Sequence, residues 1–288
     1  MSRVGVGVPT RNRSALLREA LVCLKDQTER DIEVLVLDNG STDDTAQVFQ
    51  DVVGSDPRFR YRRQETLVPM LTNFLDALDG VSADYFLWRA DDDLSAPDYL
   101  ERLADQLDAE PEADLAVSPL KTWYAGTGVT ETTALPRFPP GDAIDRAIFL
   151  LRNAQPTWVY GLWRRSALQH NLARIQKSYP YVWAWDHLQM VPSALAGRVT
   201  AVEDTWFLQR YYGPGSYHLA TSDRLAARAA YAAICAEVLA GMTLPKQRLP
   251  DLQRALKINV DVAVGRQGRL RRKLFKEKVL AAIGLKRH

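Results

Sequence analysis

The chain has 288 residues, of which 47% are hydrophobic and 25% charged, enough to bury a sizeable core in one large domain or two small ones. The formal net charge is only +2, but nine Lys and Arg residues against a single Glu give residues 265–288 a net charge of +8. Residues 1–264 therefore carry a net charge of −6. Such an acidic body argues against nucleic-acid binding as the main function.

The cysteine content and the hydropathy pattern predict a cytoplasmic protein. Only Cys23 and Cys235 occur, so no disulfide framework is expected and a reducing compartment fits. The N-terminus leads directly into a predicted strand, without the apolar core and cleavage site of a signal peptide. No uninterrupted apolar run reaches the roughly 18 residues that a membrane-spanning helix needs.

Strands and helices alternate in the first part of the chain. Strands are predicted at 4–8, 31–37, 58–62 and 84–89, and helices at 14–27, from 42–44 onward, and at 66–78. This alternation favours a largely parallel sheet with helices on both faces, which binds ligands at the carboxyl ends of its strands. Thr10, Asp38 and Asp91–Asp93 follow three of these strands, so we expect them on one rim of the sheet.

The second half of the chain is less regular. Strands are predicted at 114–119, 158–163 and 198–208, helices at 97–108, 182–196, 222–241 and 249–264, and a long loop at 121–141. Six aromatic residues are concentrated here: Trp123, Trp158, Tyr160, Trp163, Trp183 and Trp185. We expect most of them in the core, and one or two beside a cleft, where they would stack on a sugar ring.

Three consecutive carboxylates, Asp91 to Asp93, follow the predicted buried strand at 84–89. Adjacent like charges repel by about 1 kcal/mol per pair even in water. A bound cation would relieve this repulsion, and hard oxygen ligands select Mg²⁺ or Mn²⁺, which in turn hold phosphates. The alternative interpretation is a solvated acidic turn before a helix N-terminus, where Asp is favoured.

The N-terminal strand carries Gly5-x-Gly7, which suggests a dinucleotide-binding fingerprint. We reject this interpretation because Thr10 occupies the third glycine position and Pro9 lacks the backbone N–H that a pyrophosphate needs. Instead, a metal would hold the phosphates and side chains would recognise the base. Asp38 would then accept a hydrogen bond from the imide N–H of uracil or thymine.

Several segments of residues 3–110 together resemble glycosyltransferase family 2, which has the GT-A fold. The matching segments are Val8–Arg13, Gln27–Thr28, Ile32–Thr45, Asn73, Asp84–Phe86 and Asp91–Pro97, of which Asp38–Thr45 is the most diagnostic. The resemblance implies an α/β, Rossmann-like GT-A fold with a mostly parallel central sheet flanked by helices. It also implies a nucleotide-sugar-binding half at 1–110, an acceptor-binding half of the same domain at 111–220, and a helical C-terminal extension at 221–288.

The activity that the resemblance implies is metal-dependent, inverting transfer of a hexose from a UDP- or dTDP-sugar. The acceptor would be a saccharide or a lipid-linked saccharide, with Mn²⁺ or Mg²⁺ as cofactor, in bacterial surface polysaccharide assembly. By position, the nucleotide-sugar-binding residues are Pro9, Thr10, Arg13, Asp38, Asn73 and Asp91, and the metal ligands are Asp92 and Asp93. The chain departs from the family where many members carry an Asp in place of Ala90, and where a common glycine before Asn73 is absent.

An inverting displacement needs a general base within about 3 Å of the acceptor hydroxyl, on the opposite face of the sugar. We predict Asp186, because Trp185-Asp186 resembles the Glu-Asp motif of the family, although Trp185 occupies the Glu position. The alternatives are that Asp186 is a helix N-cap with His187 on the surface, or that Glu203 or Asp204 is the base. His218 is predicted as a further metal ligand, the alternative being a solvated histidine in a Gly-Pro-rich loop.

The basic C-terminal segment, residues 265–288, is also amphipathic. Leu270, Leu274, Val279 and Ile283 form a predicted apolar stripe with Lys and Arg residues around it. Such a helix can lie on an anionic membrane, so we expect peripheral attachment to the inner face of the cell membrane. The alternatives are a solvated helix packed on the body and a nucleic-acid patch.

Two other function classes remain open from the sequence. A nucleotidyltransferase would use a similar sheet and similar carboxylates, but it would need a glycine-rich basic loop near the N-terminus, and residues 9–13 contain no glycine. A non-catalytic nucleotide-sugar-binding module is the second alternative, because Ala90 and Trp185 depart from the family motifs.

Overall fold

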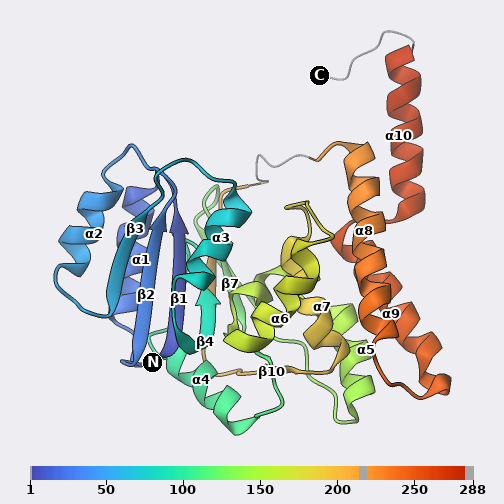
Figure 1. Cartoon of the computed structure of the whole chain (residues 1–288), viewed down its shortest axis with the longest axis horizontal. Helices are drawn as coiled ribbons and strands as arrows, with labels where there is room; N and C mark the ends of the chain where they lie inside the picture. The colour runs from blue at the N-terminus through green and yellow to red at the C-terminus, as the bar shows by residue number, and fades with distance from the viewer. Residues whose placement is uncertain (1, 214–218, 283–288) are drawn as a thin grey trace. The chain divides into compact units, whose positions relative to one another are not determined.

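A computed structural model describes residues 2–213 and 219–282 of the chain (Figure 1). The chain forms two compact units. The sheet unit comprises Met1–Arg137, Thr157–Gln169 and Arg198–Pro214, and the helical unit comprises Phe138–Pro156, His170–Gly197 and Gly215–His288. The tail residue Ile283 and the predicted metal ligand His218 lie outside the described residues.

The sheet unit is built on a seven-stranded sheet in the order β10-β6-β9-β4-β1-β2-β3. Its strands are β1 (Ser2–Thr10), β2 (Ile32–Asp38), β3 (Phe59–Arg63), β4 (Ala83–Trp88), β6 (Leu115–Val117), β9 (Leu162–Arg164) and β10 (Val199–Ala201). Strands β1 to β4 are mutually parallel, β9 runs antiparallel to both β4 and β6, and β10 is parallel to β6. The predicted α/β class with a mostly parallel central sheet is confirmed.

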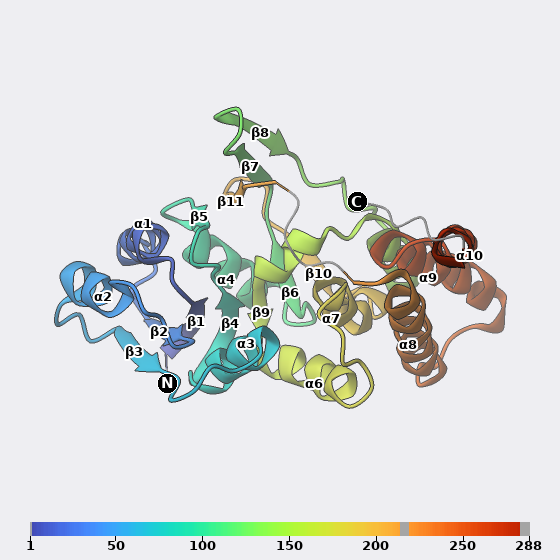
Figure 2. The same cartoon turned by 90° about the horizontal axis from the view of Figure 1, so that it is seen from above.

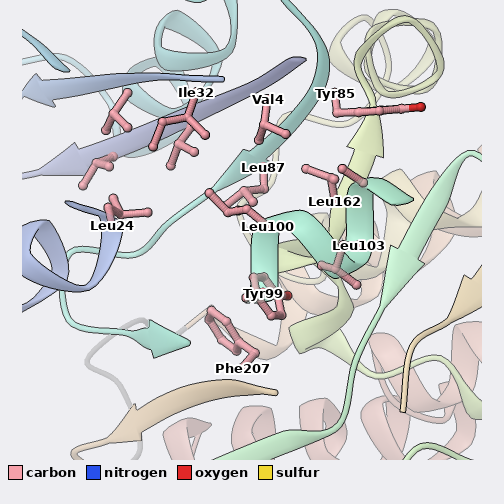
Figure 3. Packing of buried hydrophobic residues seen from close by; sticks show 14 of the residues in the cluster. Val4, Leu24, Ile32, Tyr85, Leu87, Tyr99, Leu100, Leu103, Leu162 and Phe207 are labelled. Carbon is pink, nitrogen blue, oxygen red and sulfur yellow. The ribbon is translucent and has the colours of Figure 1, made fainter. Parts of the chain in front are cut away.

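Helices cover both faces of this sheet (Figure 2). They are α1 (Ser14–Lys25), α2 (Thr45–Val53), α3 (Met70–Asp79) and α4 (Tyr99–Ala109). On one face, Val4, Val6 and Val8 of β1 belong to a buried cluster with leucines of α1 and α4, part of which Figure 3 shows. On the other face α3 lies so close that a Cβ on Gly7 would come within 3.0 Å of Ala77. Strands buried on both faces explain why their sequences are continuously apolar.

A second, four-stranded sheet in the order β5-β11-β7-β8 also belongs to the sheet unit. Its strands are β5 (Leu94–Ser95), β7 (Leu120–Tyr124), β8 (Val129–Thr133) and β11 (Phe207–Tyr211). Strand β11 pairs antiparallel with β5 and parallel with β7, and β7 and β8 form a hairpin (Figure 2). The long loop predicted at 121–141 is therefore wrong over this hairpin, whose β7 is partly buried and whose β8 is exposed and has no continuous apolar run.

Two further predicted elements in the second half differ from the structure. The strand predicted at 198–208 is two strands, β10 and β11, in different sheets, because the polar turn at Glu203 and Asp204 separates them. The strand predicted at 158–163 is a 3₁₀ turn (Pro156–Tyr160) followed by β9. Gly161 lies at this junction, where a Cβ would come within 2.4 Å of the Ala116 carbonyl oxygen. Any larger residue would therefore clash with the backbone of β6.

The helical unit contains α5 (Ala143–Asn153), α7 (Trp185–Leu195), α8 (Thr221–Ala240), α9 (Leu249–Ala263) and α10 (Gln267–Ala282), with a short 3₁₀ turn at Lys246–Arg248. Helix α6 (Arg165–Gln176) crosses the division between the units. Buried Asn259 of α9 accepts a hydrogen bond from Tyr231 of α8 at 2.7 Å and donates one to the Leu151 carbonyl of α5 at 3.1 Å. The predicted helical C-terminal extension is confirmed. None of the described helices combines the length and the apolar character needed to cross a bilayer.

Candidate active site

Three side chains meet at the carboxyl-terminal edge of the parallel strands. Thr10, the last residue of β1, lies beside Asp38, the last residue of β2, in the strand register. The Thr10 hydroxyl donates a hydrogen bond of 2.7 Å to Oδ2 of Asp91, in the turn after β4. All three residues are buried. The single rim predicted for these residues is therefore present in the structure.

Arg13, just before α1, holds two carboxylates of the acidic triplet together. Its Nη1 donates to Oδ1 of Asp91 at 3.1 Å and to Oδ2 of Asp92 at 2.8 Å. Burial alone would lower the pKa of the Arg13 guanidinium, but the charges of Asp91 and Asp92 reverse this effect and raise that pKa. Burial also raises the pKa of Asp91, against the hydrogen bond from Thr10 and the charge of Arg13. The guanidinium thus occupies the position between two carboxylates that suits a cation.

The donor set at this position fits a hard divalent cation. Two carboxylate oxygens lie within hydrogen-bond reach of the Arg13 guanidinium, and the Thr10 hydroxyl bonds to one of these carboxylates. Oxygen ligands of this kind are those that Mg²⁺ and Mn²⁺ prefer. Within residues 2–213 and 219–282, no three His, Cys, Asp or Glu side chains are already arranged around a common metal position. A divalent cation at this position would share the carboxylates of Asp91 and Asp92 with Arg13.

Asp93 is bound differently from its two neighbours. Its side chain is 2% exposed, and its Oδ1 accepts a hydrogen bond of 3.0 Å from the backbone N–H of Arg210 in β11. Burial and the adjacent charge of Asp92 raise the pKa of Asp93 to about 7, against the hydrogen bond from Arg210. Asp93 therefore anchors the four-stranded sheet to the acidic turn.

Asp38 is fully buried and both of its carboxylate oxygens are engaged. Oδ1 accepts hydrogen bonds from the backbone N–H and the hydroxyl of Ser41, at 2.8 and 2.5 Å, and Oδ2 accepts one from the Tyr61 hydroxyl at 2.5 Å. Burial, reinforced by Asp38, raises the pKa of Tyr61, which keeps Tyr61 a donor. The turn between Asp38 and Ser41 passes through Gly40 at φ +72°, a left-handed conformation that favours glycine.

The remaining motif residues position these groups. Asn39 forms two hydrogen bonds of 2.9 Å with the backbone of Val68, which fixes the segment before α3. Buried Asn73 of α3 donates to the carbonyl of Leu37 at 3.1 Å, next to Asp38. Pro9 is buried in β1 beside Leu37. Asn73 and Pro9 therefore both stabilise the end of β2 through Leu37.

Two residues of this region had no role assigned from the sequence. Fully buried Arg89 follows β4 directly, and its guanidinium carbon lies 5.6 Å from the centroid of the Tyr99 ring and 5.3 Å from that of Phe207. It also donates a hydrogen bond of 2.9 Å to the Ser95 hydroxyl. Buried Gln27 donates to the carbonyl of Ala96 at 2.8 Å and accepts from the backbone of Leu100 at 3.1 Å. Both secure the segment that follows the acidic triplet. The only signal in the sequence was the Gln27–Thr28 match to the family.

Asp186, the predicted base, lies in the first turn of α7 in the helical unit. The residue that begins this helix as N-cap is Ala184, so the alternative that Asp186 caps the helix is wrong. Burial raises the pKa of Asp186 and lowers the pKa of His187, which is only 7% exposed rather than on the surface. The competing Asp204 is an exposed residue paired with Arg102.

Comparisons with known proteins identify the family of the chain. A family model described as Glycosyl transferase family 2 matches residues 5–154. An uncharacterised protein of Mycobacterium tuberculosis H37Rv is 28% identical over 222 residues, which are 74% of this chain. The chain spans about 60% of the length of that relative. The GalNAc(5)-diNAcBac-PP-undecaprenol beta-1,3-glucosyltransferase of Campylobacter jejuni is 34% identical over 94 residues, 32% of this chain and 30% of that protein.

Two solved structures show the same fold. Staphylococcus aureus TarS 1–349 in complex with UDP-GlcNAc superimposes with a TM-score of 0.60 at 18% identity, over 91% of this chain and 81% of that one. The mannosyltransferase PcManGT of Pyrobaculum calidifontis, in complex with GDP-Man and Mn²⁺, gives a TM-score of 0.55 at 17% identity, over 98% and 81%. The predicted GT-A fold is therefore confirmed.

Proposed function

The chain belongs to glycosyl transferase family 2, and we propose that it moves a hexose from a UDP- or dTDP-sugar to a saccharide or lipid-linked saccharide. In this proposal the sugar inverts at its anomeric carbon and the reaction depends on Mn²⁺ or Mg²⁺. The structures of TarS with UDP-GlcNAc and of PcManGT with GDP-Man and Mn²⁺ support the donor class and the cofactor. The undecaprenol-linked substrate in the name of the Campylobacter relative supports a lipid-linked acceptor in polysaccharide assembly.

The observation that carries the proposal is the cluster formed by Thr10, Arg13, Asp91 and Asp92 beside buried Asp38. A nucleoside diphosphate leaves readily only when its developing negative charge is neutralised. Arg13 supplies a positive charge at this rim, and Asp92 and Asp93, with His218, are the proposed metal ligands. A bound divalent cation would supply further positive charge to the diphosphate. Charge neutralisation of this kind often stabilises the transition state by roughly 3 kcal/mol or more.

The other residues at this edge of the sheet are proposed to contact the nucleotide-sugar. Pro9, Thr10 and Arg13 would form the first nucleotide-binding loop, and Asp38 would accept a hydrogen bond from the base. Asn73 would hold the wall of this pocket, and Asp91 would contact the ribose or the donor sugar. The nucleotide-sugar would bind residues 1–110, the acceptor residues 111–220, and residues 221–288 would be an extension.

Asp186 is the proposed general base for the acceptor hydroxyl. A base works best when its pKa approaches the working pH. Burial raises the pKa of Asp186 from its usual value, which suits this task. The carboxylate accepts a hydrogen bond of 2.8 Å from the backbone N–H of His187, which orients it at the start of α7.

The exposed face of α10 supports attachment to the inner face of the cell membrane. Leu270 is buried against the helical unit, so the predicted apolar stripe does not face solvent as a whole, but Phe275 and Val279 are 69% and 42% exposed. Arg271, Arg272 and Lys273 are exposed on the same helix. An amphipathic basic helix of this kind binds anionic lipid through both its apolar and its charged groups.

Vesicle co-sedimentation tests this attachment. We expect Phe275→Ser to reduce sedimentation with phosphatidylglycerol vesicles, while Val262→Ser, at a comparably exposed position of α9, should not. Equal sedimentation of the Phe275→Ser variant and the wild type would contradict the membrane proposal without affecting the proposed transfer reaction.

Slow hydrolysis of nucleotide-sugars tests the transfer reaction itself. The full chain would be incubated with UDP-glucose, UDP-GlcNAc, dTDP-glucose and GDP-mannose, with and without Mn²⁺. Release of UDP or dTDP only when Mn²⁺ is present supports the proposal. Release of pyrophosphate would indicate a nucleotidyltransferase, and binding without any hydrolysis would indicate a non-catalytic module.

A further inference from the structure

A second pocket lies in the sheet unit, away from the acidic triplet. It has a volume of about 460 Å³ and opens between the β7–β8 hairpin and the end of β11. Tyr124, Tyr211, Tyr212, Thr127 and Glu131 line it. This volume falls within the range of about 300–1,000 Å³ that is typical of small-molecule sites.

The pocket is walled by aromatic rings that remain accessible. Tyr124 and Tyr211 pack edge to face at 5.6 Å, and Trp123 packs in the same way on Tyr212 at 6.2 Å. Tyr211 and Tyr212 are nevertheless 42% and 52% exposed. Neighbouring large side chains that are held in place yet open to solvent mark a binding surface more often than a single exposed side chain does.

The polar groups of the pocket indicate a neutral ligand that carries hydroxyl groups. Glu131 accepts a hydrogen bond from the Tyr124 hydroxyl at 3.2 Å, and the Thr127 hydroxyl lies at the turn of the hairpin. None of the described lining residues is Lys or Arg, so a phosphate or a carboxylate would meet only the negative charge of Glu131. A sugar ring satisfies both features, because its C–H face packs on an aromatic ring while its hydroxyls reach Glu131 and Thr127.

Two glycines leave the pocket open. A Cβ at Gly126 or at Gly213 would meet no atom within 4 Å. Gly213 has φ +104°, which favours glycine, but Gly126 does not have a positive φ. Neither packing nor backbone conformation therefore demands a glycine at position 126, which lines the pocket.

The pocket is connected directly to the acidic triplet through one strand. The backbone N–H of Arg210 donates to Asp93, and Tyr211 and Tyr212 follow immediately in the chain. Strand β5, which starts right after Asp93, pairs with β11 at Leu94 and Leu208. Because an extended chain rises about 3.3 Å per residue, Tyr212 lies about 7 Å along the chain from Arg210.

We propose that the pocket formed by Tyr124, Tyr211, Tyr212 and Glu131 is a subsite for a neutral saccharide unit of the acceptor. This inference rests on the proposed transfer function, since it names where part of the acceptor is held. In this arrangement the tyrosine rings stack on a sugar unit and Glu131 accepts from its hydroxyls. A saccharide bound here is anchored to the strand that also fixes Asp93.

Saturation-transfer NMR with the full chain tests the subsite directly. The probes are maltopentaose, chitopentaose and laminaripentaose, which are neutral and differ in linkage. We expect saturation transfer to at least one of them. In Tyr212→Ala, which removes a ring, and in Gly126→Leu, which fills the pocket, the signal should fall at least fivefold, while in Tyr212→Phe it should change less than twofold.

Controls separate this inference from the proposed function. Both Tyr212→Ala and Gly126→Leu should hydrolyse nucleotide-sugar at the wild-type rate, which also shows that they fold. The subsite is refuted if none of the three probes binds the wild type, or if Tyr212→Ala and Gly126→Leu bind as the wild type does. A wild type that binds saccharide yet never hydrolyses a nucleotide-sugar would instead contradict the transfer function.

Discussion

The hydroxyl of Thr10 donates a hydrogen bond of 2.7 Å to Asp91, and this contact joins the end of β1 to the turn after β4 across 81 residues of sequence. Both side chains are buried, so water cannot replace the hydroxyl if it is removed. The contact fixes Asp91 next to Thr10, which lies beside Asp38 in the pairing of β1 with β2.

Replacing Thr10 by Val should therefore destabilise the protein. The variant keeps the shape of the side chain but leaves a buried carboxylate oxygen without its donor, which typically costs about 1–3 kcal/mol. Urea denaturation measures the difference. Thr10→Ser, which keeps the hydroxyl, is the matched control, and equal losses in the two variants would show that the hydrogen bond is not the cause.

Arg13→Gln should make the protein depend on a divalent cation for stability. Without the guanidinium, the charges of Asp91 and Asp92 repel, so the Tm of the metal-free variant should fall, and added Mn²⁺ should raise it more than in the wild type. Thermal unfolding with and without Mn²⁺ measures both effects. Arg18→Gln is the control, because Arg18 is equally exposed (47%) and pairs with Asp51 elsewhere. If both variants respond alike to Mn²⁺, the cation does not bind at Asp92, beside Arg13.

Stability should decrease below pH 6.5 because of His187. Burial lowers the pKa of His187 from its usual value of 6.5, so in acid the unfolded chain takes up this proton before the folded chain does. The contribution of His187 is therefore complete above pH 6.5 and is lost as the pH falls. The raised pKa of Asp186 has the opposite effect, since its contribution is lost as the pH rises.

Urea midpoints at pH 5.5, 6.5 and 7.5 measure the effect of His187. The decrease in stability between pH 6.5 and 5.5 should become smaller in His187→Gln and stay the same in His170→Gln, which removes an exposed histidine of α6. An unchanged decrease in His187→Gln would assign the pH dependence to other groups.

Asp186→Asn should fold and bind the donor as the wild type does, yet transfer sugar at least a hundredfold more slowly. This loss is within the range of about 10²–10⁴ expected when a general base is removed. The transfer rate at saturating acceptor measures it, and the donor-induced rise in Tm verifies donor binding. Near-native turnover of Asp186→Asn would exclude Asp186 as the base.

The sequence was most informative where local pattern and motif agree. Continuous apolar runs predicted β1, β2 and β4, and residues that follow these strands, such as Thr10 and Asp38, lie on one rim because parallel strands end at one edge. The motif residues Asn39 and Gly40 were visible as part of a family pattern, but only the structure shows that Asn39 binds Val68.

Contacts between distant segments were not predictable from local pattern. The hydrogen bond from Arg210 to Asp93 spans 117 residues, and the second part of the predicted strand at 198–208 pairs with β5 and β7 in another sheet. Buried Arg89 carries a charge that propensity would place at the surface, yet two aromatic rings enclose it. The burial of His187 likewise depends on its neighbours in the helical unit.

Anomalous diffraction at the manganese edge, from crystals grown with UDP and Mn²⁺, tests most directly whether this rim holds a metal–diphosphate. We predict a manganese peak at Asp92 and Asp93 and at both phosphates, with the uracil base beside Asp38. UDP bound without a manganese peak at Asp91–Asp93, or bound away from Thr10 and Asp38, would contradict the proposed site.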